Sequence, residues 1–119
     1  MRIVGMVERL REAVGGPISV DRAWTARNVA NLIASPQAAV FVSRNGFIAG
    51  SLTPTIINPQ PIAVEHGWFA DDGNGLRLLR KFEKWATEAG APMIQLSTGC
   101  NGLDLSRFGY RAVETAWVR

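Results

Sequence analysis

Two glycines at the mouth of an expected helix are the first feature of the sequence that could bind a ligand. Gly73 and Gly75 flank Asn74, and a leucine-rich helical pattern begins directly after them. Glycine lets backbone N–H groups approach an anion, and a helix N-terminus adds partial positive charge, so the segment predicts a cradle for phosphate oxygens. A second interpretation stays open, in which Asp72 or Asn74 caps the helix and the glycines only form the turn.

Arg77 lies in the first turn of the same helix. A cation there works against the helix dipole, and a nearby anion would explain its position. We therefore expect Arg77 to contact a phosphate. The alternative is a solvated polar face made with the other basic residues of the helix, which are Arg80, Lys81 and Lys84.

Glu65 and His66 could carry acid–base chemistry shortly before this loop. An alkylamine keeps its proton up to pH ~10, so acyl transfer to an amine needs a base. His66 has a near-neutral pKa without perturbation, whereas the pKa of Glu65 would have to be raised by burial. Neighbouring strand residues point to opposite faces, so only one of the two can face a substrate directly. The alternative is a satisfied histidine and a surface ion pair.

The elements that would position these residues begin with two helices. Apolar residues at helical spacing predict a helix from Ile3 to Val14, stopped by Gly15-Gly16-Pro17. Asp21 is the expected N-cap of a second helix, which ends near Ser35-Pro36. Asn45-Gly46 then joins two β-rich runs, which is a strong hairpin signal.

Further along the chain, prolines at 54, 59 and 61 predict a loop before a third strand from Ile62 to Ala70. A helix follows from Gly75 to Ala89. Its expected buried stripe comprises Leu76, Leu79, Phe82, Trp85 or Ala86, and Ala89. A strand at 92–97, a helical turn at 103–107 and a last strand at 110–119 complete an α+β order, with a central mixed β-sheet flanked by helices.

Composition limits the classes of protein. The 119 residues suit one domain, and a chain that is 47% hydrophobic and 19% charged can bury a core. No apolar run reaches the ~20 residues of a membrane span, so we expect no membrane contact and a cytoplasmic location. With a single cysteine, Cys100, and a single histidine, no metal site is expected, and the thiol is read as inert. The net charge of +3 favours anionic partners.

Four stretches resemble the GNAT family of acetyl-coenzyme A-dependent N-acetyltransferases, particularly its short bacteriophage members. They are "RNGFIAGSL", "VEHGWFA", "LRLLRKFEKWATEAGAPMIQLS" and "LSRFGYRAVETAWVR", and together the likeness covers about residues 36–119. The resemblance implies one GNAT-like domain over residues 1–119, with the acyl-CoA N-acyltransferase fold.

The same resemblance implies an N-acetyltransferase that takes acetyl-CoA as co-substrate and a primary amine as acceptor. Its catalytic candidates are Glu65, at the family's acidic position, and His66. The residues implied in coenzyme binding are Trp68, Phe69, Ala70, Gly73, Asn74, Gly75, Leu76 and Arg77, with backbone N–H groups near Phe69–Ala70 as donors to the oxyanion.

Departures from the family pattern keep two other functions open. The phosphate loop is eroded, because Asp71 and Asp72 stand where a basic or amide residue is usual. In addition, Leu105 stands where many members carry the tyrosine that protonates the leaving thiolate. Tyr110 is interpreted as core packing. One alternative is therefore an inactive interaction module of phage origin. A weaker one is a basic nucleic-acid adaptor, which the lack of interleaved aromatic residues disfavours. The family's first strand is missing, and the open sheet edge would suit a homodimer.

Overall fold

The computed structural model describes residues 2–99 and 103–119, beginning with the two expected helices. They are α1 (Arg2–Val14) and α2 (Arg22–Ala34). The predicted N-cap is confirmed, since Asp21 Oδ1 accepts a hydrogen bond of 3.0 Å from the N–H of Trp24. The predicted hairpin is confirmed too, with strands β1 (Ala38–Ser43) and β2 (Gly46–Thr55), but its turn lies at Arg44-Asn45, because Gly46 already pairs with Ser43.

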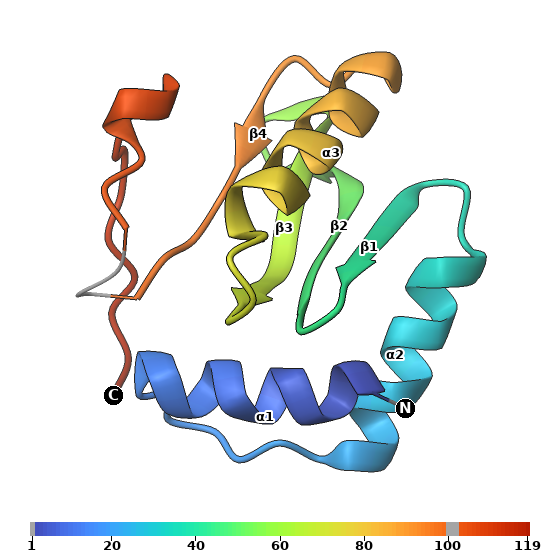
Figure 1. Ribbon diagram of the computed structural model, residues 1–119. Helices are drawn as coiled ribbons and strands as arrows, with labels where there is room; N and C mark the ends of the chain where they lie inside the picture. Colours follow the sequence, from blue (N-terminus) through green and yellow to red (C-terminus); the bar gives the residue numbers. More distant parts are fainter. Residues whose placement is uncertain (1, 100–102) are drawn as a thin grey trace.

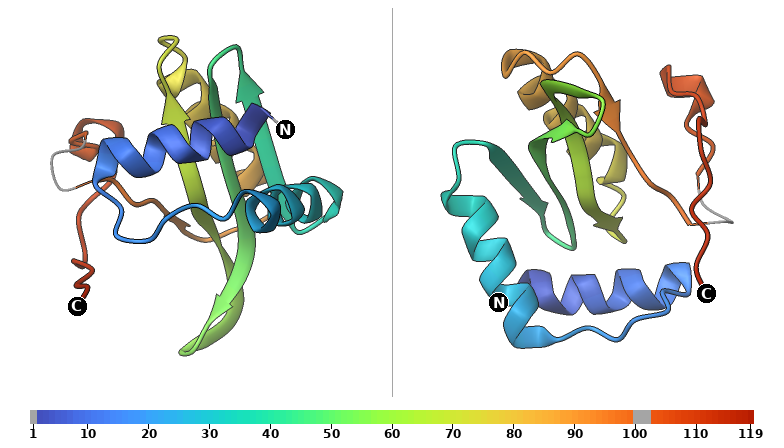
Figure 2. Two further views of the ribbon diagram at one scale, coloured as in Figure 1. Left: turned by 90° about the horizontal axis from the view of Figure 1, so that it is seen from below. Right: turned by 180° about the vertical axis from the view of Figure 1, so that it is seen from behind.

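The loop expected at the three prolines is wrong, because β2 and β3 (Asn58–Ala70) form one long antiparallel hairpin that turns at Ile56-Ile57. Pro59 and Pro61 lie in β3 before its pairing with the fourth strand begins at Ala63. A proline there removes no ladder hydrogen bond on the unpaired side, which is why the strand tolerates it. The hairpin projects from the body of the molecule, as Figure 2 shows.

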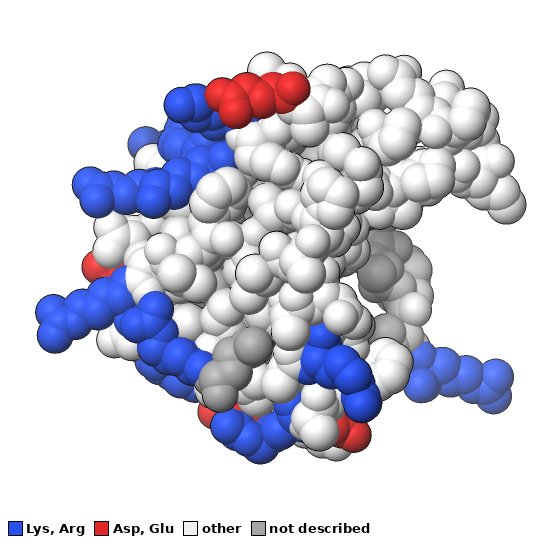
Figure 3. Space-filling view, turned by 90° about the vertical axis from the view of Figure 1, so that its right-hand side faces the viewer, with Lys and Arg blue, Asp and Glu red and all other residues white. Residues whose placement is uncertain are grey.

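The projecting part of the hairpin carries no charged side chain. No Asp, Glu, Lys or Arg occurs from Asn45 to Val64, and the tip residues Ile56 and Ile57 are 102% and 90% exposed. Figure 3 shows it as a white projection at the upper right, apart from the Lys and Arg side chains on the rest of that face.

The sheet has the order β1-β2-β3-β4. Helix α3 (Gly75–Glu88) connects β3 to β4 (Ile94–Gln95), and these two strands are parallel, whereas the other pairs are antiparallel. The predicted mixed sheet flanked by helices is thus confirmed, with α3 on one face and α1 and α2 on the other (Figure 1).

Each face of the sheet has its own apolar core. The α3 side buries Ile48, Ala63, Leu78, Leu79, Phe82 and Ala86, and the other side buries Ile3, Met6, Val29, Phe47 and Ala49. The expected stripe of α3 needs two corrections. Leu76 is 44% exposed and Leu78 is buried in its place, and Ala89 is an exposed C-cap residue just beyond the helix. The helix is rotated so that Leu78 and Leu79 both face the strands, which turns the first-turn leucine to solvent.

A bulge interrupts β3 at His66. Gly50 of β2 pairs with Glu65, and the next residue of β2, Ala49, pairs with Gly67, so His66 is the extra residue. Beyond the bulge the alternation of faces is reversed. Glu65 therefore shares the α3 side of the sheet with Trp68, and Gly67 faces Phe47 on the side of α1 and α2.

The C-terminal segment differs from the expectation. A short 3₁₀ helix, η1 (Ser106–Phe108), stands near the predicted turn, but residues 110–119 form no strand. Val113, Trp117 and Val118 are 73%, 90% and 79% exposed. Their β-type composition is not enough, because a strand also needs a neighbour for its hydrogen bonds. The packing role of Tyr110 is confirmed by its contact with the α3-side core.

None of the described helices is long and apolar enough to cross a bilayer. The prediction for the thiol of Cys100 lies outside the described residues.

Candidate functional site

The candidate site begins where β3 and β4 separate. The two parallel strands pair at Ala63–Ile94 and Val64–Gln95 only. Beyond this point β3 continues to Ala70, while the chain after β4 diverges from it (Figure 1). Among the described residues, no strand covers that edge of β3 from Glu65 to Ala70, so its backbone groups are available for hydrogen bonds.

Glu65 stands at the point of separation. Its Oε1 accepts a hydrogen bond of 3.0 Å from the N–H of Ser97, which joins β3 to the segment after β4. Burial raises the pKa of the Glu65 carboxyl, and the Ser97 N–H partly opposes that shift. A carboxyl with a raised pKa is a better proton acceptor at neutral pH than an ordinary glutamate.

His66 lies on the opposite side of the sheet, as the expected alternation of neighbours requires. Its Nε2 is 2.7 Å from the Ser51 hydroxyl, which is itself 3.3 Å from the Thr53 hydroxyl. The imidazole is exposed. The structure therefore separates the two catalytic candidates instead of bringing them together.

Asp72 holds the loop between β3 and α3. Its carboxylate accepts hydrogen bonds of 2.7 Å from the Ser43 hydroxyl, 2.7 Å from the Asn45 N–H and 3.0 Å from the Asn74 N–H. The Asn45 N–H is the main cause, with the Ser43 hydroxyl second, that the pKa of this carboxyl lies well below its usual range. The side chain is directed toward the β1–β2 turn, so its hydrogen bonds attach the β3–α3 loop to that turn.

Asp71 anchors the same loop to α1. Its carboxylate forms an ion pair with Arg9, and the Arg9 guanidinium lies 5.0 Å from the centre of the Phe69 ring. Both aspartates that stand in the place of the family's basic residue are thus engaged with the protein. The Asp71 charge is paired with Arg9, whereas the Asp72 carboxylate is held by uncharged donors of Ser43, Asn45 and the N-cap residue Asn74.

The capping interpretation of Asp72 and Asn74 is not what the structure has. Asn74 is the N-cap residue but makes no side-chain cap hydrogen bond. Asp72 accepts a hydrogen bond from the N–H of Asn74 itself, one residue before the helix. Within residues 2–99 and 103–119, no hydrogen bond uses the N–H of Gly75, Leu76 or Arg77, so these three donors of the first turn of α3 have no protein acceptor there.

The other predicted coenzyme residues are spread around this mouth. Gly73 has φ of +80°, which a residue with a side chain rarely adopts. Trp68 connects β3 to the start of α3, because its Nε1 donates a hydrogen bond of 3.1 Å to the carbonyl of Gly75. Phe69 faces α1, and Ala70 packs on the α3 side.

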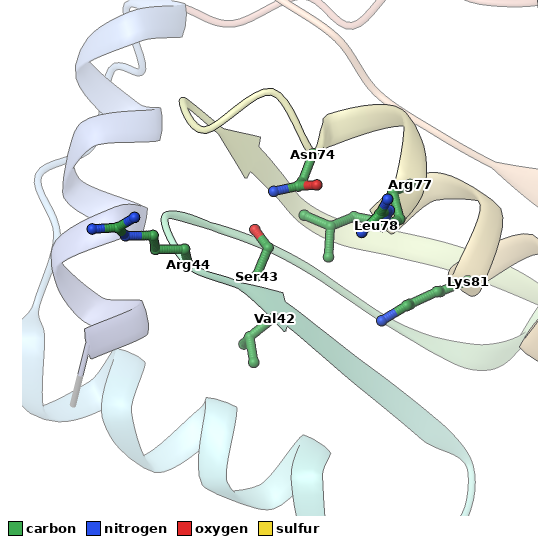
Figure 4. A pocket seen from close by; sticks show the side chains of 7 residues that line it. All are labelled: Val42, Ser43, Arg44, Asn74, Arg77, Leu78 and Lys81. Atoms are coloured by element: carbon green, nitrogen blue, oxygen red, sulfur yellow. The ribbon is translucent and has the colours of Figure 1, made fainter.

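A pocket of about 280 Å³ opens beside the mouth, between β1 and α3. Its lining residues are Val42, Ser43, Arg44, Asn74, Arg77, Leu78 and Lys81. Figure 4 shows Arg77 and Lys81 of α3 at its rim, the Ser43 hydroxyl directed toward Asn74, and the Arg44 guanidinium pointing away from α3.

Several residues of the site were not predicted from the sequence. Arg9, Ser43 and Ser97 contact the site residues from distant segments, and nothing local signals those contacts. The bulge at His66 did have a signal, because a glycine within a strand, here Gly67, often marks one.

Comparison with known proteins gives matches at the level of structure. No family model matches the chain, and no curated protein matches it. A predicted acetyltransferase from Clostridium acetobutylicum, solved with acetyl-CoA, has a TM-score of 0.74 and 16% identity over 98% of this chain and 86% of that one. AAC(6′)-Iy in complex with the bisubstrate analogue CoA-S-monomethyl-acetylneamine has a TM-score of 0.71 and 16% identity, covering 99% and 88%.

A GNAT family acetyltransferase from Staphylococcus aureus has a TM-score of 0.64 and 12% identity over 98% of this chain and 88% of its own. Identities this low establish architecture. The chain has the fold of the GNAT acetyltransferases, as the sequence resemblance predicted.

Proposed function

We propose that residues 1–119 form a single GNAT-like domain that transfers an acetyl group from acetyl-CoA to a primary amine. The observation that carries the proposal is the free edge of β3, which leads directly to the unused N–H groups at the start of α3. An extended ligand can hydrogen-bond along a free strand edge, and a diphosphate suits a helix N-terminus. The neighbours solved with acetyl-CoA and with a CoA analogue support this choice of co-substrate.

In the proposed reaction, Glu65 takes the proton of the acceptor amine, directly or through a water. The amine nitrogen then attacks the thioester carbon, a C–N bond forms, and the C–S bond breaks. Backbone N–H groups near Phe69–Ala70 would stabilise the oxyanion. The sulfur leaves as the coenzyme A thiolate, which needs no acid because the pKa of the thiol is ~8.5, and the thiolate then takes a proton from water. The hydroxyl of Tyr110 is already engaged, because it donates a hydrogen bond of 2.7 Å to Glu83.

His66 is the alternative base. Its contact with the Ser51 hydroxyl would orient the ring, but it lies across the sheet from Glu65. Measuring turnover of Glu65→Gln and His66→Asn separately assigns the role. Normal turnover in both variants would exclude both residues.

Thermal melting with acetyl-CoA tests the binding step. A ligand at 100 times its Kd adds ~2.7 kcal/mol, which for a chain of this size corresponds to an increase of about 10 °C in Tm. Gly75→Glu should remove the increase, because its carboxylate would face the phosphates. The fold should accept it, since a Cβ at Gly75 would lie 3.6 Å from Ala70 Cβ, an ordinary contact. Gly75→Ala is the matched control and should keep the increase.

Two results would contradict the proposal. If neither acetyl-CoA nor CoA changes the melting of the wild-type protein, the inactive interaction module of phage origin becomes the better explanation. Retention on DNA that falls steeply with salt would favour the nucleic-acid adaptor.

The outer edge of β1 supports a homodimer as part of the same proposal. Among the described residues β1 is the edge strand of the sheet, and its backbone is open to pairing with a second copy. Sedimentation at increasing concentration tests this, and a monomer at all concentrations would exclude it.

A further inference from the structure

We infer that the pocket between β1 and α3 binds a phosphate monoester, through Arg77 and Lys81. Its volume of about 280 Å³ lies just below the ~300–1,000 Å³ of pockets that hold whole small molecules. It is therefore sized for a group and not for an entire coenzyme. If the chain binds acetyl-CoA, as the proposed function holds, this phosphate monoester is the 3′-phosphate of coenzyme A.

The charges of the pocket favour a dianion. Arg77 and Lys81 line it one helical turn apart, and neither forms an ion pair in the part of the chain that the structure describes. Like charges at this spacing repel each other, and their place in the first two turns of α3 opposes the helix dipole. An anion between them would offset both costs. The ammonium of Lys81 is directed toward the space between β1 and α3 in Figure 4.

The Asp72 carboxylate is adjacent to the pocket but is not among its lining residues. Its oxygens accept hydrogen bonds from the Ser43 hydroxyl and from the backbone N–H groups of Asn45 and Asn74, so three donors already offset its charge. Arg77 and Lys81 therefore leave a net positive charge at the rim. The contact with Asp72 leaves the Ser43 hydroxyl proton engaged, so we do not count Ser43 among the donors, and Arg44 points away from α3.

Two sources could supply such a phosphate: the coenzyme itself, or a separate phosphorylated molecule. Calorimetric titration at low salt with coenzyme A, 3′-dephospho-coenzyme A and inorganic phosphate separates them. The test variant is Lys81→Gln. Lys84→Gln is the matched control, because it removes the same charge from an exposed position of α3 outside the pocket.

If the coenzyme is the source, coenzyme A should bind about tenfold more tightly than the dephospho form to the wild-type protein and to Lys84→Gln, but equally to Lys81→Gln. If the source is separate, the two coenzymes bind alike, and inorganic phosphate binds the wild-type protein and Lys84→Gln but not Lys81→Gln. The inference is overturned if no probe distinguishes Lys81→Gln from Lys84→Gln. Phosphate binding that depends on Lys81, without binding of either coenzyme, would refute the proposed function and leave the pocket assigned.

Discussion

Gly50 allows β2 to pass beneath the ring of Phe82, next to the bulge that positions Glu65. A Cβ at this position would lie 2.4 Å from the Val64 carbonyl oxygen and 2.5 Å from Phe82 Cζ. Ordinary contacts between carbon atoms are ~3.5–4.0 Å, so the ring would have to move by about 1 Å. Phe82 is 0% exposed, so any movement of its ring displaces other core side chains.

Overpacking of this kind costs ~1–3 kcal/mol. For a chain of 119 residues, that cost corresponds to a Tm lower by about 4–12 °C. We therefore expect Gly50→Ala to melt in this lower range and to lose acetyl transfer even below its Tm, because the displaced Val64 carbonyl precedes Glu65. Scanning calorimetry and initial rates at 20 °C or below measure the two effects.

The control is the same substitution at Gly5 in α1, where a Cβ would meet nothing within 4 Å. Replacing a helical glycine by alanine should stabilise the protein by ~0.5–1 kcal/mol. Adding Phe82→Leu should make Gly50→Ala less costly, since the shorter side chain relieves the contact. A Tm for Gly50→Ala within about 1 °C of wild type, or equal costs with and without Phe82→Leu, would refute the reasoning.

Three further outcomes follow from the charges of the site. Glu65→Gln should reduce kcat/KM, and the wild-type rate should fall as pH drops through a pKa above the ordinary 4.5 of glutamate; an unchanged pH profile in the variant would exclude Glu65 as the base. The raised pKa also means that the ionised Glu65 carboxylate destabilises the folded protein at pH values above that pKa. Glu65→Gln should therefore raise Tm at pH 8 relative to wild type, and this gain should disappear below pH 4.5. Asp72→Asn should raise the KM for acetyl-CoA and leave kcat unchanged. The variant should also have a lower Tm than the wild-type protein, by the full amount above pH 3.8 and by less as the pH falls below that value, because the pKa of Asp72 is lowered in the folded state. Equal Tm values at pH 7 would contradict the anchoring role.

The parts of the fold that sequence could predict depend on local signals. Asp21, Asn45-Gly46 and the glycine that opens α3 act within a few residues, and each marks the element it predicts, although the hairpin turn lies one residue earlier, at Arg44-Asn45. The last strand failed because strand formation depends on a partner, which residues 110–119 do not have in the structure. The composition of a segment indicates its preferred secondary structure, but it does not indicate whether a neighbouring strand is present to pair with it.

For the site, the sequence indicated the mouth of α3 but gave the wrong reason for its aspartates. Read locally, Asp71 and Asp72 repel a phosphate or cap the helix. Apart from the Asn74 N–H, their actual partners are Arg9, Ser43 and Asn45, which are 27 or more positions away along the chain. Only the folded sheet brings these segments together. In the fold the two aspartates, whose charges look unfavourable in the sequence, hold the β3–α3 loop in place.

The shared attachment of the Asp72 carboxylate means that the β1–β2 turn and the phosphate loop behave as one part. Exchanging the loop of this protein for that of a relative would leave Ser43 and Asn45 without their acceptor. A working chimera would have to carry residues 43–45 and 71–75 together, so these two short segments are expected to have been inherited as a unit.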